Sequence, residues 1–414
     1  MPCEGGGGAG WKGVLLMDKA CPTPGSFRDA IGKIIFLTFL FFLSFINRFI
    51  FAPLLPSISN ELGITTAQAG SIFLFGSIGV AAGAIFSGFV SSIFNHKGAL
   101  EISMLGAGVI LMACIFSGTL QAIQLAMVSL GIAAGFNLPS NMAVITAIVT
   151  RQDWGKALAV QQTGPPLSLI LGPLLSALLL PWMSWRMILA WISGVLIISG
   201  FALMRYGRFG DFPGDRPNFS NIRMIIGRRS FRVMFVLFAL GIAANLGLYT
   251  MLPLYLVKEH GFGQELANTM VGLAQISTFF MTFVGGWLTD RFGEKPIMAA
   301  SLIISGVLTI LLGTLSGIWF NVIIFLEPAV VVCFFPAAFA ALSRIVQPNL
   351  RSLVTAWTTP FAFTIGGGLY PAALGYMGQA FSIGLGITIA GILMVLGSSL
   401  VIFIDLLDKM EEGC

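Results

Sequence analysis

Residues 31–56 read IGKIIFLTFLFFLSFINRFIFAPLLP, and this stretch sets the class of the whole chain. It is almost entirely apolar and long enough to cross a bilayer as a helix. Arg48 lies a little past its midpoint, directly after Asn47. Because arginine at a membrane helix centre costs about 2.5–3.5 kcal/mol even on lenient insertion scales, Arg48 must face a polar interior. The stretch therefore predicts a membrane helix that carries a functional cation.

The composition excludes a soluble protein. Of 414 residues, 57% are hydrophobic and only 9% are charged, whereas soluble chains carry about 25% charged residues. The net charge of +5 would suggest nucleic acid or acidic partners in a soluble chain, but here the distribution of charge matters more, and we expect no nucleic-acid partner. No cysteine or histidine cluster predicts a metal or cofactor, no Walker motif predicts ATP-driven transport, and no residue constellation predicts an enzyme.

Apolar runs of about 20 residues predict twelve membrane helices. They centre near residues 32–55, 67–93, 99–117, 121–148, 156–180, 185–206, 232–256, 265–289, 295–314, 317–344, 352–376 and 380–404. The sequence thus predicts an all-α membrane protein with two six-helix bundles, residues 31–206 and 231–404. A tail (1–30), a central loop (207–230) and a second tail (405–414) complete the chain.

Lysine and arginine are distributed unevenly between the two sides of the membrane. Nearly all of them fall on the side that holds both termini and the central loop, while the opposite side takes only Arg186 and Lys258. The positive-inside rule therefore predicts cytoplasmic termini in a multi-pass protein of the plasma membrane, the inner membrane of a bacterium. The sequence leaves open whether Met1 or Met17 is the native start.

The two predicted bundles are related by an internal repeat. At one offset of 198 residues, polar or backbone-special residues coincide in five pairs: Asn47 with Asn245, Glu61 with Glu259, Gly63 with Gly261, Gly88 with Gly286, and Pro173 with Pro371. Such parallel repeats are typical of transporters whose two halves rock about a central site.

A loop motif in the second half resembles that of a known family of membrane proteins. Residues 286–295, GWLTDRFGEK, resemble the G-x-x-x-D-R-x-G-R/K-R/K loop of the major facilitator superfamily, with Gly286, Asp290, Arg291 and Gly293 at the motif positions. In the first half, residues 88–97 carry Ser92 in place of the aspartate. The resemblance covers essentially the whole chain. It implies a twelve-helix secondary transporter, a monomer, in which Asp290 and Arg291 belong to a cytoplasmic charge network.

The start of the chain also resembles the anion:cation symporter branch of that superfamily. Asn47-Arg48, the prolines that follow, and Glu61-Leu62-Gly63 match the opening of this branch, and residues 131–139, 153–157 and 184–186 echo it. Asn47 stands where the branch has an aspartate, and Ala134 where many members carry a glutamate. The proton-coupling carboxylates of the branch therefore cannot be transferred to this chain.

Two embedded charges are the leading functional candidates. A buried guanidinium recognises carboxylate through a bidentate fork, so Arg48 is predicted to bind substrate; the alternative is an internal ion pair. Glu327 is the acidic residue deep within a predicted span. It could approach Arg48 and take up a proton when an anion arrives, serve as a strut or gate, or contact substrate directly.

Neutral polar residues complete the predicted site. If the resemblance holds, the first, fourth, seventh and tenth helices face the cavity, and the predicted lining residues are Asn47, Asn137, Asn141, Asn245, Tyr249 and Trp357. Each amide has an alternative role in an interhelical hydrogen bond.

The sequence as a whole predicts proton symport of a small organic anion of the monocarboxylate kind by alternating access. One embedded arginine without a second cation in the spans argues for a substrate of low charge. An exporter of hydrophobic compounds with the same fold is one alternative, and a nutrient sensor without transport is another.

Overall fold

The computed structural model describes residues 26–214, 227, 229–347 and 351–406. In the first bundle the helices are α1 (Phe27–Phe49), α2 (Phe51–Leu62), α3 (Thr66–Cys114), α4 (Leu120–Ile148), η1 (Arg151–Asp153), α5 (Trp154–Gln161), α6 (Gly164–Leu179) and α7 (Trp185–Tyr206). The predicted tails, apart from a few residues beside the helices, and most of the central loop lie outside the described residues. The first helix begins at Phe27, inside the predicted tail.

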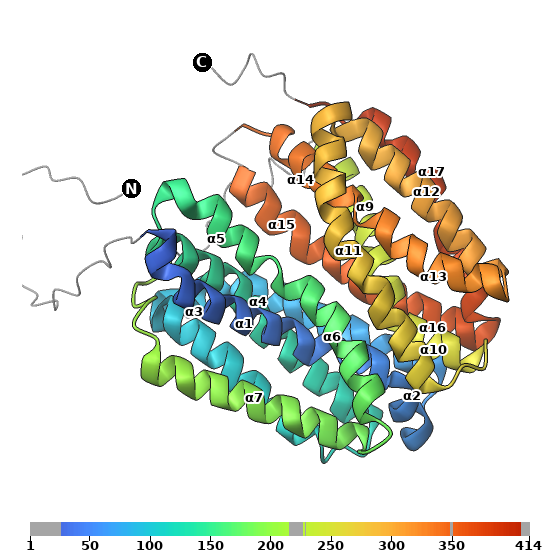
Figure 1. Ribbon diagram of the computed structural model, residues 1–414, viewed down its shortest axis with the longest axis horizontal. Coiled ribbons are helices and arrows are strands. Elements are labelled where there is room, and N and C mark those ends of the chain that lie inside the picture. Colours follow the sequence, from blue (N-terminus) through green and yellow to red (C-terminus); the bar gives the residue numbers. More distant parts are fainter. Residues whose placement is uncertain (1–25, 215–226, 228, 348–350, 407–414) are drawn as a thin grey trace, which may run out of the picture.

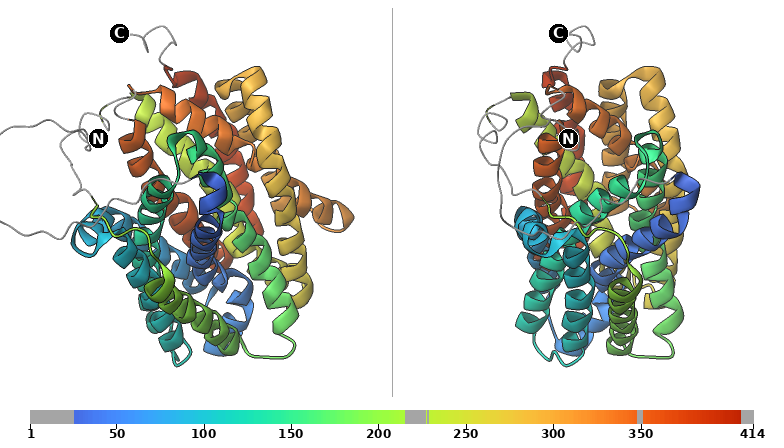
Figure 2. Two further views of the ribbon diagram at one scale, coloured as in Figure 1. Left: turned by 60° about the vertical axis from the view of Figure 1, so that its left-hand side comes forward. Right: turned by 90° about the vertical axis from the view of Figure 1, so that its left-hand side faces the viewer.

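In the second bundle the helices are α9 (Arg229–Ile242), η2 (Ala243–Gly247), α10 (Leu248–Lys258), α11 (Gln264–Phe292), α12 (Glu294–Thr314), α13 (Ile318–Val331), α14 (Phe334–Arg344), α15 (Arg351–Thr364), η4 (Ile365–Leu369), α16 (Tyr370–Ala380), α17 (Ile383–Ser398) and η5 (Ser399–Phe403). The described part of the chain contains no strand. Figure 2 shows the two bundles from the side, the first in blue to green and the second in yellow to red.

Nine helical segments in the described residues are long and apolar enough to cross a membrane. One of them, α3, makes two passes, because Asn95 interrupts it with φ 63° and ψ 169°. Two further passes are broken into shorter helices: α5 with α6, and α15 with η4 and α16. The described helices are therefore consistent with the twelve passes predicted from the sequence.

Local sequence explains the breaks within the passes. Proline lacks an amide hydrogen and disrupts the helix around it, and Pro53 follows the junction of α1 and α2 at Ile50. Gly164-Pro165 begins α6 after a break at residues 162–163. In α13 the interior Pro328 precedes the break before α14. These breaks free backbone carbonyls inside a bundle, where other groups can use them.

The internal repeat extends to backbone conformation. Gly63 and Gly261, which are 198 residues apart, both have positive φ, at 61° and 69°. Asn95 and Gly293 are related by the same offset and have nearly the same conformation, with φ 63° and 87° and ψ 169° and 166°. Asn95 therefore takes over the role of the second motif glycine in the first half, because asparagine tolerates positive φ better than most residues.

The two membrane sides of the molecule differ in how the bundles meet. We call the side with Phe27, Tyr206 and Phe403 the terminal face, and the side with residues 63–65, 180–184, 259–263 and 381–382 the loop face. Figure 1 shows α2, α6, α10 and α16 gathered toward the loop face. In Figure 2, α6 (green) runs beside α11 (gold).

Hydrogen bonds between the bundles lie at mid-depth or toward the loop face. At the loop face the Ser57 hydroxyl donates to Gln264 at 2.7 Å, and the amides of Gln264 and Asn268 donate to the Pro53 carbonyl at 2.8 and 3.1 Å. At mid-depth, Thr364 donates to the Ser77 carbonyl at 3.3 Å. Among the described residues, the hydrogen bonds identified between the bundles lie at these two depths.

One carboxylate at the terminal face fixes the start of α1. Asp153 accepts a hydrogen bond from the Phe27 amide at 3.1 Å and forms an ion pair with Lys156 at 3.1 Å. These contacts, with that of Lys156 the strongest, hold the pKa of Asp153 below its usual value.

Candidate functional site

Arg48 lies in the last turn of α1, just before the break at Ile50. Its side chain is buried, with 7% of its surface exposed, and its Nε donates to the Ser44 carbonyl at 3.4 Å. The guanidinium carbon lies 5.3, 5.6 and 5.7 Å from the ring centroids of Phe45, Phe49 and Phe363, respectively. Because Phe363 belongs to α15, the cation sits at the boundary between the two bundles.

No carboxylate neutralises this cation within the described part of the chain. The ion pairs there are Lys97–Glu101, Lys156–Asp153, Arg186–Glu61 and Arg344–Glu294. Arg48 and Glu327 were expected to approach each other, but they form no ion pair in this structure. Sequence reasoning placed both at a similar depth, which is insufficient because helix rotation decides which neighbours a side chain meets. Burying a charge without an opposite charge costs free energy, so binding of an anion next to Arg48 would be favourable.

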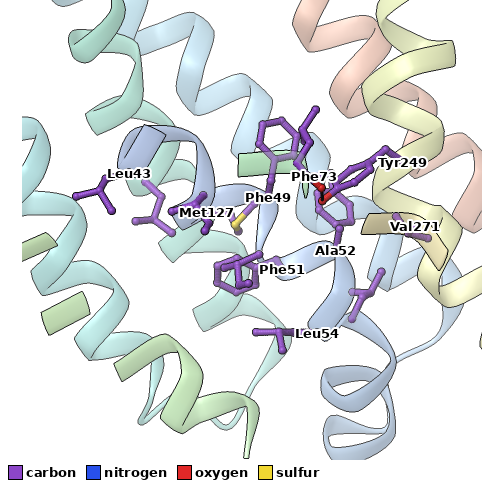
Figure 3. Packing of buried hydrophobic residues seen from close by; sticks show 14 of the residues in the cluster. Leu43, Phe49, Phe51, Ala52, Leu54, Phe73, Met127, Tyr249 and Val271 are labelled. Carbon is purple, nitrogen blue, oxygen red and sulfur yellow. Dashed lines mark hydrogen bonds between the residues drawn. The ribbon is translucent and has the colours of Figure 1, made fainter. Parts of the chain in front are cut away.

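Aromatic side chains close the site toward the loop face. The ring of Phe49 contacts those of Tyr249 and Phe363 edge to face, at centroid distances of 6.2 and 6.4 Å. The Tyr249 hydroxyl donates to the Leu169 carbonyl of the opposite bundle at 3.2 Å. Figure 3 shows Phe49 and Ala52 of the first span beside Tyr249 and Val271 of the second bundle. These contacts join rings of the two bundles next to Arg48.

The predicted amides of the first bundle fall into two groups. Asn141 is fully engaged, because it donates to the Leu37 carbonyl and accepts from Gln161, both at 2.9 Å. Asn47 and Asn137 are equally buried, but Asn47 Oδ1 and both polar atoms of Asn137 have no hydrogen-bond partner. Asn141 thus takes the alternative role of an interhelical contact, while Asn47 and Asn137 retain unused hydrogen-bonding capacity.

Three of the four predicted site residues in the second bundle lie together. Asn245, Tyr249 and Glu327 line one small cavity between η2, α10, α11, α12 and α13. Trp357 stacks on Phe361 at 5.4 Å in α15 and does not line this cavity. Glu327 is 3% exposed and accepts a hydrogen bond from the Ser305 hydroxyl at 2.8 Å.

Sequence reasoning missed three contributors to the site. Phe363 supplies a face of the Arg48 environment, Ser305 binds Glu327, and Gln275 lines the same cavity as Glu327. Each is a common residue type in a membrane helix, so only its neighbours reveal its position. The internal repeat at an offset of 198 residues gave no indication of these three residues.

The loop-motif residues lie at the terminal face. Gly286 and Asp290 are in the last two turns of α11, and Gly293 ends this helix with positive φ. Arg291 is exposed and lies over the rings of Trp287 and Phe292 at 5.4 and 5.6 Å. Asp290 and Arg291 take part in none of the ion pairs among the described residues, and their role in a charge network stays a prediction. No cluster of metal-ligating side chains occurs among the residues that the structure describes.

Curated relatives of the chain are membrane transporters. It is 24% identical over 297 residues to the gallate transporter of Pseudomonas putida, covering 63% of this chain and 66% of the relative, just under two thirds of its length. It is 26% identical over 283 residues to the multidrug resistance protein MdtG of Citrobacter koseri, covering 64% and 68% of the two chains.

A solved structure has the same fold. A bacterial homolog of the human lysosomal transporter Spinster, in an inward-facing and occupied conformation, superposes with a TM-score of 0.76 over 92% of this chain and 97% of that one, at 15% identity. The family model described as Major Facilitator Superfamily matches residues 37–371 and 264–412. With its membrane-spanning helices and repeated bundles, the chain belongs to the major facilitator superfamily.

Proposed function

We propose that this transporter carries a small organic anion, bound through its carboxylate by Arg48, and that it does so by proton symport. The observation that carries the proposal is the burial of Arg48 at the bundle boundary with no anionic partner among the described residues. A carboxylate could form a bidentate pair with the guanidinium and supply the missing charge. One cation favours a monocarboxylate.

The surroundings of Arg48 favour an anion with a flat apolar part. Phe45, Phe49 and Phe363 surround the guanidinium, so an aromatic or planar substrate could pack on the same rings. The unpartnered polar atoms of Asn47 and Asn137 are available to substrate hydroxyls or water. The name of the gallate transporter supports this substrate class, since gallate is an aromatic carboxylate.

We place the proton on Glu327. A buried carboxylate without a cation partner is far more stable when protonated, so a proton would bind there as the substrate binds at Arg48. The two sites lie in different bundles, and rocking of the bundles would link them. Glu327 then acts as the coupling group rather than as a strut for Arg48.

The positive-inside distribution of charge supports a cytoplasmic terminal face. With the bundles fastened at the loop face, the described conformation would then be open toward the cytoplasm. We accordingly assign the protein to the plasma membrane, the inner membrane of a bacterium, with both termini inside and as a monomer.

Export of hydrophobic compounds is a second candidate. Its support is the similarity to MdtG and the aromatic surroundings of Arg48. An exporter would tolerate loss of the cation, whereas an anion carrier would not. The role of Arg48 therefore separates the two functions.

Uptake of radiolabelled benzoate into proteoliposomes tests the proposal. We expect Arg48→Gln to lower uptake at least about 100-fold, because truncating a buried charge partner costs about 3–5 kcal/mol. Arg48→Lys should retain a fraction, since lysine keeps the charge but loses the bidentate fork. Arg186→Gln removes a loop-face arginine that is paired with Glu61 and serves as the control.

The outcomes separate the candidate functions. Uptake that is equal in wild type and Arg48→Gln would contradict the anion site. Loss of resistance to apolar drugs on deletion, unaffected by Arg48→Gln, would instead support export. Binding of benzoate without any flux would indicate the sensor.

A further inference from the structure

A small cavity inside the second bundle is distinct from the aromatic surroundings of Arg48. Its wall is formed by η2, α10, α11, α12 and α13 and includes Asn245, Gln275 and Glu327. None of the three rings that face Arg48 lines it, although Tyr249, which does line it, contacts the ring of Phe49. The cavity is therefore a separate candidate site within one bundle.

The polar side chains of this cavity offer unused oxygen atoms. Glu327 accepts a hydrogen bond from Ser305 through Oε1 and belongs to none of the described ion pairs. Gln275 is 4% exposed, lines the same cavity, and has no hydrogen-bond partner for its Oε1. An unpartnered buried amide oxygen costs free energy, so this oxygen is available to a ligand.

Backbone geometry frees one carbonyl oxygen in the helix that carries Glu327. Pro328 lacks an amide hydrogen, so the carbonyl of Ile324, four residues earlier, loses its helical donor. Ile324 lines the cavity. The π-helical segment η2, which contains Asn245, widens the helix at the same place, as single π turns at functional sites do. Broken helices of transporters use such carbonyls to coordinate Na⁺.

We propose that this cavity binds one Na⁺, with Glu327, Gln275 Oε1 and the Ile324 carbonyl as its ligands. The donor set is all oxygen and carries one negative charge, which suits a hard monovalent cation. The inference rests on the proposed function, in which Glu327 is the coupling group. Na⁺ would bind to the Glu327 carboxylate.

The other side chains placed around Glu327 carry no formal charge. Ser305 on α12 donates to it, and Tyr249 on α10 lines the same cavity. Tyr370 on α16 lies within electrostatic reach of Glu327. Among the residues that line the cavity, Glu327 is the one carboxylate.

Thermal unfolding of the purified full chain tests the site. The melting temperature is measured in NaCl and in choline chloride at equal ionic strength, at pH 8.5 and 5.5. We expect NaCl to raise the wild-type value by about 2–4 °C at pH 8.5, where protons compete least for the carboxylate.

Variants locate the site. Glu327→Gln should abolish the Na⁺-dependent shift, and Gln275→Leu should reduce the Na⁺ affinity at least about 10-fold. Gln161→Leu is the matched control, since Gln161 is also buried and has an unpartnered Oε1, but it lies in the first bundle. Its Na⁺-dependent shift should equal that of wild type.

Two results would overturn the proposal. One is an equal melting temperature in NaCl and choline chloride for wild type at both pH values. The other is a Na⁺ shift that persists in Glu327→Gln. Benzoate uptake that still depends on Arg48 would then show that only the Na⁺ site is wrong, whereas loss of both effects would mean that the proposed function fails as well.

Discussion

Arg48 and Glu327 show how two buried charges can be kept apart in one membrane protein. Each is almost fully buried, but Arg48 meets aromatic rings and a backbone carbonyl, whereas Glu327 meets a serine. Separate sites leave Arg48 free for an anion and Glu327 free for a cation. A direct ion pair would have satisfied both charges and left neither available.

The sequence predicted much about these residues, but not their neighbours. The cost of burial marks Arg48 and Glu327 as functional without any structure, because apolar spans rarely tolerate charge. Hydropathy gives the depth of a residue, not its rotation about the helix axis. Arg48 and Glu327, which could approach one another by depth, form no ion pair among the described residues in this conformation, and the roles of Phe363 and Gln275 were missed.

Phe363 offers a test at the scale of one residue. Replacing Phe363 by leucine keeps the site apolar but removes one aromatic ring. The centroid of that ring lies 5.7 Å from the guanidinium carbon of Arg48. We expect Phe363→Leu to weaken binding of aromatic carboxylates about 3–10-fold and acetate much less, because ring stacking is worth about 0.5–1.5 kcal/mol. Isothermal titration measures both affinities.

Phe280→Leu is the control for this substitution, since Phe280 on α11 is 64% exposed. Equal losses of affinity for benzoate and acetate in Phe363→Leu would contradict packing of an aromatic substrate on this ring.

At the scale of elements, the positive-φ turns end helices at equivalent places in the two bundles. Gly293 ends α11, and Asn95 divides α3, with nearly the same backbone angles. The sequence repeat had lost the glycine at residue 95, so pattern matching alone did not reveal the equivalence. Asn95 therefore holds a backbone conformation that is strained for a residue with a Cβ.

This equivalence predicts opposite effects of two substitutions. Asn95→Gly should leave stability unchanged or raise it by up to about 1 kcal/mol, because glycine adopts positive φ without strain. Gly293→Ala should lower stability by about 1–2 kcal/mol, because alanine at positive φ is strained. Thermal unfolding in detergent measures both, with Gly286→Ala as the control.

Gly286 suits that role, because a Cβ there would have no atom within 4 Å. If Gly293→Ala proved as stable as Gly286→Ala, the left-handed turn would not matter for stability.

At the scale of the whole molecule, the loop face holds the two bundles together. The Pro53 carbonyl accepts hydrogen bonds from both Gln264 and Asn268, and Ser57 donates to Gln264. Alternating access requires these bonds to break when the loop face opens. The sequence predicted two bundles and a central site, but the closed face depends on side-chain contacts between halves and had no sequence signal.

Removing these three hydrogen bonds should shift the equilibrium between the conformations. We expect the double variant Gln264→Leu/Asn268→Leu to populate states open at the loop face, because three hydrogen bonds between the bundles are lost. Spin labels placed at loop-face residues of the two bundles would report longer distances. Thr269→Val is the control, since its hydroxyl bonds within its own helix, to the Glu265 carbonyl.

An unchanged distance distribution in the double variant would mean that these hydrogen bonds do not stabilise this conformation. Longer distances in Thr269→Val as well would show that the change follows from any substitution in α11.

The central claim, that Arg48 is the anion site, is tested most directly by thermal unfolding of wild type and Arg48→Gln with benzoate and benzamide. The two compounds have nearly the same shape and differ in charge. A ligand at 100 times its dissociation constant adds about 2.7 kcal/mol to the folded state, so binding is readily visible. We predict that benzoate stabilises wild type but not Arg48→Gln, and that benzamide stabilises neither. Equal stabilisation of both proteins by both compounds would contradict the anion site and favour a carrier of neutral apolar molecules.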